Sequence, residues 1–298
     1  MPRLTSSPTP ARMHDVRLAV SYPDEATRVG IAARLRGATV VPWAPGDRDA
    51  VMLCGAAHLC EQLLGGGAPV LLVADPCPTA DAMESLFATA RTSGVPFAVV
   101  NLDRYLPSRQ LIKKQLAGPL GEPGLIRSHR WEPPSADRAS DPAALPDALL
   151  RDLDVALWLA GRAPNRVYAT GQKAEGAADR CIQVHLGFAN GGMALLDYTN
   201  RLPPGDGYQS LSVIASSGAA YADDHQNAQL LYCGGNAQAV RTKERAGQLA
   251  SVAQEFVDAL RAGQNLSASA TDWHAVFALA KIVQKSLASG RAVEVEAL

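Results

Sequence analysis

An apolar strand runs directly into a helix start in the stretch Arg17-Leu18-Ala19-Val20-Ser21-Tyr22-Pro23-Asp24-Glu25. Proteins that bind a dinucleotide carry glycines at such a turn, because the backbone must come close to a pyrophosphate whose charge the helix N-terminus favours. This turn has no glycine. Asp24 and Glu25 place carboxylates in the same field, where each favours the helix by about 0.3 to 1 kcal/mol and repels a phosphate. The turn therefore predicts a strand-helix unit without the usual phosphate site.

Short apolar runs alternate with helical stretches through the first 120 residues. This alternation is typical of βαβ units and predicts a parallel sheet with helices on both faces. The expected strands are Val16–Val20, Thr39–Trp43, Ala50–Leu53, Val70–Val73 and Phe97–Asn101, and the expected helices are Ala26–Gly37, His58–Leu64 and Ala80–Thr92.

The pattern changes from Gly121 onward to longer strand-like runs with hairpin signals at 190–192 and 234–235, which predict a large and mostly antiparallel open sheet. The overall prediction is an α/β fold with a disordered tail over 1–14, a parallel-sheet domain over 15–120 and an α+β domain over 121–298, whose last helices could pack back on the first domain. The expected strands here are Leu125–Trp131, Arg166–Thr170, Cys181–Ala189, Met193–Tyr198 and Leu211–Ala215, and the helices are Pro146–Leu159, Leu249–Ala262 and Trp273–Ala288.

Composition excludes several classes of partner. With 28 Lys and Arg against 29 Asp and Glu, and no basic block, the chain has no electrostatic footprint for nucleic acid or an anionic membrane. No apolar run approaches the roughly 20 residues that span a bilayer, so we expect a cytoplasmic protein. Five scattered cysteines without a Cys-x-x-Cys pair indicate neither a disulfide framework nor a zinc site. The short acidic cluster that ends at His225 is interpreted as a solvated turn, so no metal is expected.

Several segments together resemble the glucose-fructose oxidoreductase, inositol dehydrogenase and rhizopine-catabolism (Gfo/Idh/MocA) family over nearly the whole chain. The resemblance implies a Rossmann-like domain, a second domain with an open sheet, and nicotinamide-dependent hydride transfer. The segments that carry it are Asp49–His58, Gly67–Val73, Val99–Pro107, Gly118–Pro123, Asp152–Gly161, Glu255–Leu260 and Ser286–Val293.

The residues that the family uses for cofactor and catalysis are missing at four matching positions. The glycine-rich turn is absent, and Val40–Trp43 offers no charged residue to meet the adenosine ribose. The family's Glu-Lys-Pro motif, whose lysine positions the nicotinamide and assists proton transfer, corresponds here to Ala74-Asp75-Pro76. The Asp-x-x-x-His of its cleft helix, whose histidine is the general acid/base, corresponds to Asp147 and Arg151. An arginine stays protonated to about pH 12 and cannot exchange a proton during turnover.

These replacements predict that no cofactor binds and that ordinary hydride transfer is lost. Asp75, Asp147 and Arg151 are the candidate catalytic residues, although Asp147 and Arg151 could equally be an ordinary ion pair on a helix surface. The cleft residues suit a sugar or polyol, because carboxylates and arginines bridge vicinal hydroxyls while Trp131 or Tyr198 could stack on a sugar face. The candidate substrate-binding residues are Asn101, Arg104, Lys113, His129 and Asp154.

Three functions stay open at this point. The chain could be a ligand-binding or partner subunit, or an enzyme of non-redox chemistry in which Asp75 or Asp147 accepts a proton and Arg151 holds an anion. It could also be an NAD(P)-dependent oxidoreductase with an unusual cofactor-binding site. The apolar alternation over 184–198 predicts a homo-oligomer, or a heteromer with an active relative through the same face.

Overall fold

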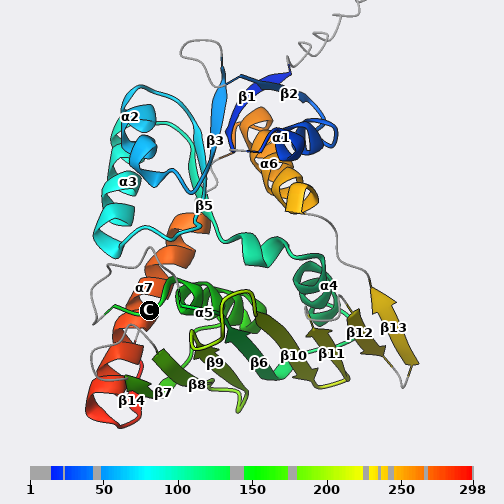
Figure 1. The fold of residues 1–298 in the computed structure, drawn as a ribbon, viewed down its shortest axis with the longest axis vertical. Helices are drawn as coiled ribbons and strands as arrows, with labels where there is room; N and C mark the ends of the chain where they lie inside the picture. Colours follow the sequence, from blue (N-terminus) through cyan, green and yellow to red (C-terminus); the bar gives the residue numbers. More distant parts are fainter. Residues whose placement is uncertain are drawn as a thin grey trace, which may run out of the picture.

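The computed structural model describes residues 15–22, 24–42, 48–134, 144–173, 180–223, 228–233, 236–240, 245–264 and 268–296. The tail expected over 1–14, the turn at 234–235 and His225 lie outside the described residues. Two sheets lie at opposite ends of the molecule, with helices packed between and around them (Figure 1).

The first sheet is parallel, as the alternation predicted, with strand order β2-β1-β3-β4-β5. Its central strands are continuous apolar runs, because a parallel sheet is covered on both faces. Its strands are β1 (Val16–Ser21), β2 (Ala38–Val41), β3 (Ala50–Cys54), β4 (Val70–Val73) and β5 (Phe97–Val100).

Helices cover both faces of the parallel sheet. On one face lie α1 (Glu25–Ala32) and α6 (Arg245–Arg261), packed on the buried side chains of Leu18 and Met52. On the other lie α2 (Cys60–Gly65), α3 (Ala80–Ser93) and the first part of α7 (Ala268–Ser289), around Leu53 and Trp273. A short 3-10 turn, η1 (Ala57–Leu59), precedes α2. The last two helices therefore return to the first sheet.

The second sheet has nine strands in the order β13-β12-β11-β10-β6-β9-β8-β7-β14 and is antiparallel except where β6 pairs with β9. The short strands from β11 to β14 were not among the predicted ones, because runs such as Gly218–Asp223 are rich in alanine and lack the β-branched signal. The strands are β6 (Pro123–Trp131), β7 (Arg166–Lys173), β8 (Arg180–Gly187), β9 (Met193–Thr199), β10 (Tyr208–Ala215), β11 (Gly218–Asp223), β12 (Ala228–Cys233), β13 (Asn236–Val240) and β14 (Val293–Glu294).

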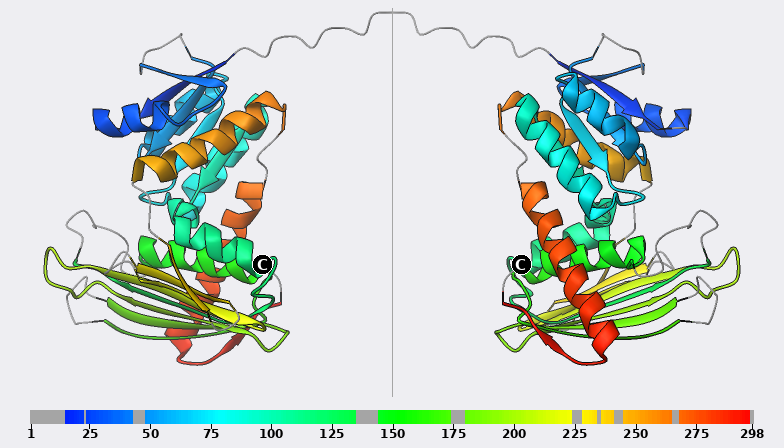
Figure 2. Two further views of the ribbon diagram at one scale, coloured as in Figure 1. Left: turned by 90° about the vertical axis from the view of Figure 1, so that its right-hand side faces the viewer. Right: turned by 90° about the vertical axis from the view of Figure 1, so that its left-hand side faces the viewer.

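One face of the large sheet packs against α5 (Asp147–Ala160), α4 (Pro107–Leu116) and the last part of α7. Figure 2 shows this face turned toward the first sheet, whereas no described helix covers the opposite face. Helix α5 thus lies between the two sheets. The chain reaches the second sheet through η2 (Leu102–Tyr105), which follows β5 directly. The carboxyl ends of β4 and β5 consequently face α5.

Candidate functional site

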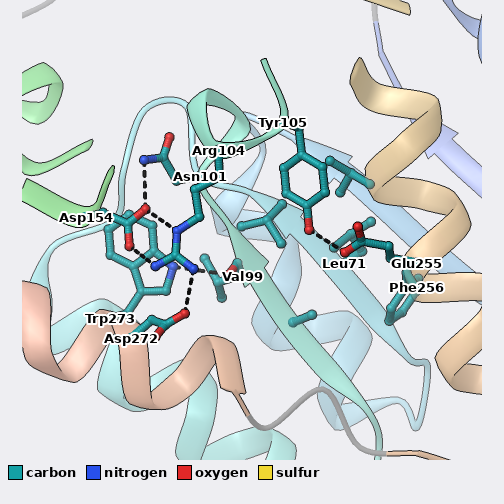
Figure 3. Close-up of a pocket in the computed structure, with 13 residues that line it drawn as sticks. Leu71, Val99, Asn101, Arg104, Tyr105, Asp154, Glu255, Phe256, Asp272 and Trp273 are labelled. Carbon is teal, nitrogen blue, oxygen red and sulfur yellow. Dashed lines mark hydrogen bonds and ion pairs between the residues drawn. The ribbon is translucent and has the colours of Figure 1, made fainter. Parts of the chain in front are cut away.

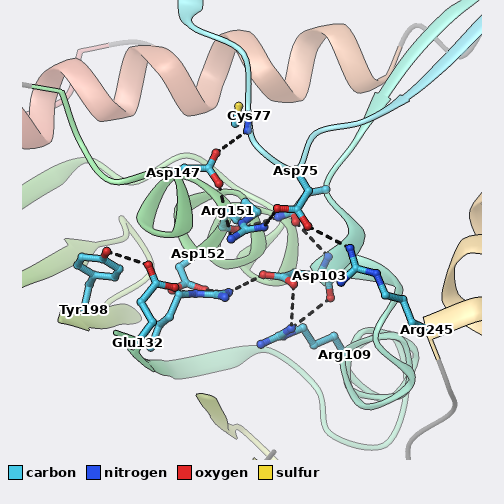
Figure 4. Close-up of polar contacts among 12 residues, drawn as sticks. Asp75, Cys77, Asp103, Arg109, Glu132, Asp147, Arg151, Asp152, Tyr198 and Arg245 are labelled. Carbon is cyan, nitrogen blue, oxygen red and sulfur yellow. Dashed lines mark hydrogen bonds and ion pairs between the residues drawn. The ribbon is translucent and has the colours of Figure 1, made fainter. Parts of the chain in front are cut away.

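The three predicted catalytic residues lie together where β4 ends beside α5 (Figure 4). Arg151 Nη1 donates to Asp75 Oδ1 at 2.8 Å, and Arg151 Nη2 lies 3.6 Å from Asp147 Oδ2. Asp147 also accepts a hydrogen bond from the backbone N–H of Cys77 at 2.6 Å. The Arg151 and Asp147 side chains are each only 16% exposed, so the pair lies in the junction between the sheets and not on an open helix surface.

A second arginine, which the sequence did not single out, reaches the same carboxylate. Arg245 is the first residue of α6, and its Nη2 donates to Asp75 Oδ2 at 3.2 Å. Each oxygen of Asp75 therefore accepts a hydrogen bond from a different guanidinium group.

A second group of charged residues lies buried beside this one. Arg130 on β6 donates from Nε and Nη2 to the two oxygens of Asp152 on α5 at 2.9 and 2.7 Å, and also donates to Asp103. Burial acts to raise the pKa of Asp103, but the nearby Arg130 and Arg109 guanidinium groups outweigh it and hold the pKa well below its ordinary value. Removing one partner of such a pair leaves an uncompensated buried charge. The network therefore fixes β6, η2 and α5 relative to one another.

Three of the predicted ligand-binding residues form a neighbouring group (Figure 3). Arg104 donates to Asp154 at 2.8 Å and to Asp272 at 2.7 Å. Asn101 donates to Asp154 and to the backbone carbonyl of Arg151, both at 2.9 Å. These residues bind one another and hold the backbone of α5. They line a cavity of about 160 Å³ together with Leu71, Val99, Tyr105, Glu255, Phe256 and Trp273 among others.

The other two predicted ligand-binding residues lie elsewhere. The Lys113 ammonium on α4 donates to the carbonyl of Trp158 and lies 5.5 Å from the centre of its ring. Burial and the nearby Arg104 lower the pKa of Lys113. His129 is on the side of β6 opposite to Arg130, 3.1 Å from Asp197, so it projects from the face of the sheet that no described helix covers.

The two aromatic candidates lie on opposite faces of the large sheet. Trp131 packs on Tyr208 with ring centres 4.9 Å apart, on the same face as His129. Tyr198 is buried and donates to Glu132 at 2.9 Å. Neither side chain is therefore joined to the Asp75 carboxylate.

At the edge of the parallel sheet, one feature agrees with a dinucleotide site and another does not. In the strand order β2-β1-β3 the topological switch point lies between β1 and β3, which is where doubly wound sheets bind ligands. At the start of α1, however, Asp24 already accepts hydrogen bonds from the N–H groups of Ala26 at 3.2 Å and Thr27 at 2.8 Å. The strand order is that of a dinucleotide-binding sheet, but two of the amides that usually hold the phosphate already donate to the Asp24 side chain.

Within the described ranges, no three His, Cys, Asp or Glu residues are grouped so as to hold a metal ion. The described helices include none with the length and apolar character to cross a membrane.

The second part of the chain matches a known family. Residues 108–221 match the model of the GFO/IDH/MocA C-terminal domain. No protein of curated function matches the chain in sequence.

Solved structures match nearly the full chain in fold. A putative myo-inositol dehydrogenase from Sinorhizobium meliloti 1021 is 20% identical, with a TM-score of 0.73 over 94% of this chain and 99% of that one. An oxidoreductase from Agrobacterium radiobacter in complex with NAD+, L-tartaric acid and magnesium is 15% identical, with a TM-score of 0.72 over 94% and 98%. GenD2 from gentamicin A biosynthesis, in complex with NAD, is 20% identical, with a TM-score of 0.71 over 98% and 100%.

These structures correct one prediction. The prediction that no cofactor binds is wrong, because two of the structures that share this fold hold NAD. The prediction depended on individual side chains at four positions, whereas the binding crevice of a doubly wound sheet is formed by the whole edge at the switch point.

Proposed function

We propose that this chain, whose residues 108–221 match the GFO/IDH/MocA C-terminal domain, binds NAD(P) at the edge of its parallel sheet and a sugar or polyol beside α5, but has lost ordinary hydride transfer. In that role it acts as a ligand-binding protein, alone or as a subunit paired with an active relative. The observation that carries the proposal is the ion pair between Asp75 and Arg151. It stands where the family resemblance implies a lysine and a histidine.

The loss of hydride transfer follows from the proton that must move with the hydride. Oxidation of an alcohol needs a group near the hydroxyl that accepts its proton at neutral pH. Burial acts to lower the pKa of Arg151, but Asp103 and Asp147 outweigh it and raise the pKa further above its ordinary value. Arg151 therefore stays charged and accepts no proton. Both oxygens of Asp75 already accept hydrogen bonds from arginines.

The cofactor part of the proposal is supported by the fold and its crevice. Bound NAD(P) would supply the hydride acceptor. This chain's own contribution would come from the carboxyl ends of β1 and β3 and from Arg28 on α1, which is also ion-paired with Glu25. Arg28 Nη1 donates to the backbone carbonyl of Tyr22 at 2.8 Å. A guanidinium at this place could contact a phosphate that cannot use the amides capped by Asp24.

The ligand part of the proposal is supported by the chemistry of the groups beside α5. Charged carboxylates and guanidinium groups converge there from β4, α5 and α6, and such groups bind hydroxyl-rich molecules through several hydrogen bonds at once. Asp75, Asp147, Arg151 and Arg245 are the residues assigned to this cleft.

A second copy of the chain is the partner proposed for the uncovered sheet face. Four large apolar side chains on that face are between 37% and 47% exposed, and each alternates with buried neighbours on its strand. Exposed apolar residues gathered on one face are typical of an interaction surface. They are Tyr168, Met193, Ile214 and Tyr221.

Calorimetric titration tests the binding that the proposal requires. The purified chain is titrated with NAD+, NADH and NADP+, and then with inositols and simple sugars in the presence of the tightest cofactor. We expect micromolar to submillimolar binding of one cofactor and measurable binding of one ligand class. Absence of any cofactor binding at millimolar concentration would contradict the proposal.

A further inference from the structure

Two arginines from distant parts of the chain converge on one carboxylate at the junction of the parallel sheet and α5. Arg151 comes from α5 and contacts Asp75 Oδ1, whereas Arg245 comes from α6 and contacts Asp75 Oδ2. Figure 4 shows both guanidinium groups directed at Asp75 from different elements. Each carboxylate oxygen therefore has its own charged donor, and such charge-assisted hydrogen bonds are among the stronger ones that proteins make.

The position of Arg151 does not depend on Asp75. The backbone carbonyl of Arg151 accepts a hydrogen bond from Asn101, and its guanidinium is also held near Asp147. Arg151 Nε is buried and finds no acceptor within the part of the chain that the structure describes. If Asp75 withdrew, Arg151 would therefore keep its place and offer hydrogen bonds to another acceptor.

Asp75 is the residue of this group whose side chain can move away from its partners. It lies two residues beyond the end of β4, and its side chain is 37% exposed, while that of Arg245 is 54% exposed. The ion pair between Asp75 and Arg245 is weakly held at such exposure, because water competes for both partners. In the pair with Arg151, which is 16% exposed, Asp75 is the more exposed partner. An incoming anion could replace the Asp75 carboxylate without moving a buried element.

The charges that remain favour a single negative charge on the ligand. Without Asp75, and within the residues that the structure describes, the two cations Arg151 and Arg245 are left with one carboxylate beside them, that of Asp147, which lies 3.6 Å from Arg151. In the neighbouring buried group, the two positive charges of Arg109 and Arg130 are balanced by the two negative charges of Asp103 and Asp152. One positive charge is then uncompensated, whereas a neutral sugar would leave the Asp75 ion pairs as they are.

We infer that the cleft is selective for a sugar acid, whose carboxylate takes the place of Asp75 between Arg151 and Arg245. This inference rests on the proposed function, since it names the class of ligand that the same cleft binds. Asp75 then acts as an internal competitor of the ligand.

Titration of matched probes tests the inference. The full chain, saturated with its cofactor, is titrated at low ionic strength with D-gluconate and D-glucuronate, with the neutral D-glucose and myo-inositol, and with glucose 6-phosphate. We expect the two carboxylates to bind at least about tenfold more tightly than the neutral probes, which is the effect of one charge-assisted contact. Equal binding of neutral and acidic probes, or tighter binding of glucose 6-phosphate, would overturn the inference and leave the proposed function standing.

Variants separate competition by Asp75 from a direct role in binding. Asp75→Asn should tighten gluconate binding several-fold, and Arg245→Gln should weaken it about tenfold. Arg91→Gln removes an arginine from an exposed ion pair with Glu84 on α3 and should leave binding unchanged. Weaker gluconate binding by Asp75→Asn would overturn the inference. Failure of every probe to bind while the cofactor binds would overturn both the inference and the sugar-binding part of the proposed function.

Discussion

Asp75 and Arg151 are 76 residues apart in the chain, yet they share a hydrogen bond of 2.8 Å that joins the end of β4 to α5. The bond links the parallel sheet to the helix that lies between the two sheets. The resemblance to the Gfo/Idh/MocA family implies a catalytic lysine and a catalytic histidine at these two positions. The aspartate and arginine that replace them bind each other.

Replacing Asp24 should change cofactor affinity. Asp24→Ser keeps a side-chain cap for α1 but removes the negative charge, so we expect NAD(P) to bind up to about fivefold more tightly. Arg28→Gln should weaken binding. Calorimetry measures both, with Asp81→Ser in the first turn of α3 as the control. Unchanged affinity in both variants would place the phosphates away from this turn.

The buried charge network should make stability depend on pH below about 4. The pKa of Asp103 is lowered in the folded protein, so near the ordinary value of about 3.9 only the unfolded chain takes up its proton, and the free energy of unfolding falls as pH falls. Asp103→Asn should cost about 3 kcal/mol at neutral pH, because Arg130 loses a charged partner, and should flatten the acid dependence. Urea denaturation between pH 3 and 7 measures both effects.

The matched control for this experiment is Glu84→Gln, which breaks an exposed ion pair with Arg91. It should change stability by less than about 1 kcal/mol. An acid dependence that is as steep in Asp103→Asn as in the unaltered protein would show that other carboxyl groups control acid unfolding.

Three cysteines should resist alkylation in the folded protein. Burial raises the pKa of Cys54 and Cys60 to about 12, and burial together with Asp147 raises the pKa of Cys77. At pH 8 the thiolate fraction of Cys54 and Cys60 is then about a thousandfold lower than that of a free cysteine. Peptide mapping after iodoacetamide treatment should find all three unlabelled until urea is added. Rapid labelling of Cys77 would mean that the cleft opens to solvent.

The uncovered sheet face should hold two copies of the chain together. Ile214→Glu or Tyr168→Glu places a charge among apolar side chains on that face and should convert an oligomer to monomers, because burying an unpaired charge is costly. Analytical ultracentrifugation measures the mass. Val29→Glu on α1, also an exposed apolar residue, is the control and should keep the oligomer. A monomeric unaltered protein at micromolar concentration would contradict the prediction.

The sequence predicted the parallel sheet, and the structure brings its three candidate catalytic residues, Asp75, Asp147 and Arg151, into contact. Runs such as Val70–Val73 are apolar at every position, which occurs where both faces of a strand are covered. The spacing of Asp147 and Arg151 placed both on one side of α5. Gly191, with φ of 84°, lies in the turn between β8 and β9, where the glycine pair at 191 and 192 predicted a hairpin.

The remaining site residues could not be predicted, for physical reasons. Arg245 meets Asp75 across 170 residues, and no local pattern indicates such a contact. Arg130 and Asp152 are charged residues that normally face water, and their burial depends on pairing with each other and, for Arg130, with Asp103. His129 was assigned to the cleft, but a strand directs successive side chains to opposite faces. With polar Ser128 and Arg130 on either side of His129, the sequence did not indicate which face was inside.

The most direct test of the central claim is the rate at which the cofactor-saturated chain reduces NAD(P)+ with a panel of polyols, sugars and sugar acids, followed by nicotinamide absorbance. The account predicts no turnover by the unaltered protein and measurable turnover by the double variant Asp75→Lys, Arg151→His, in which the two residue types that the family resemblance implies are restored. Turnover by the unaltered protein at the usual enzymatic rates of about 1 to 1,000 per second would contradict it.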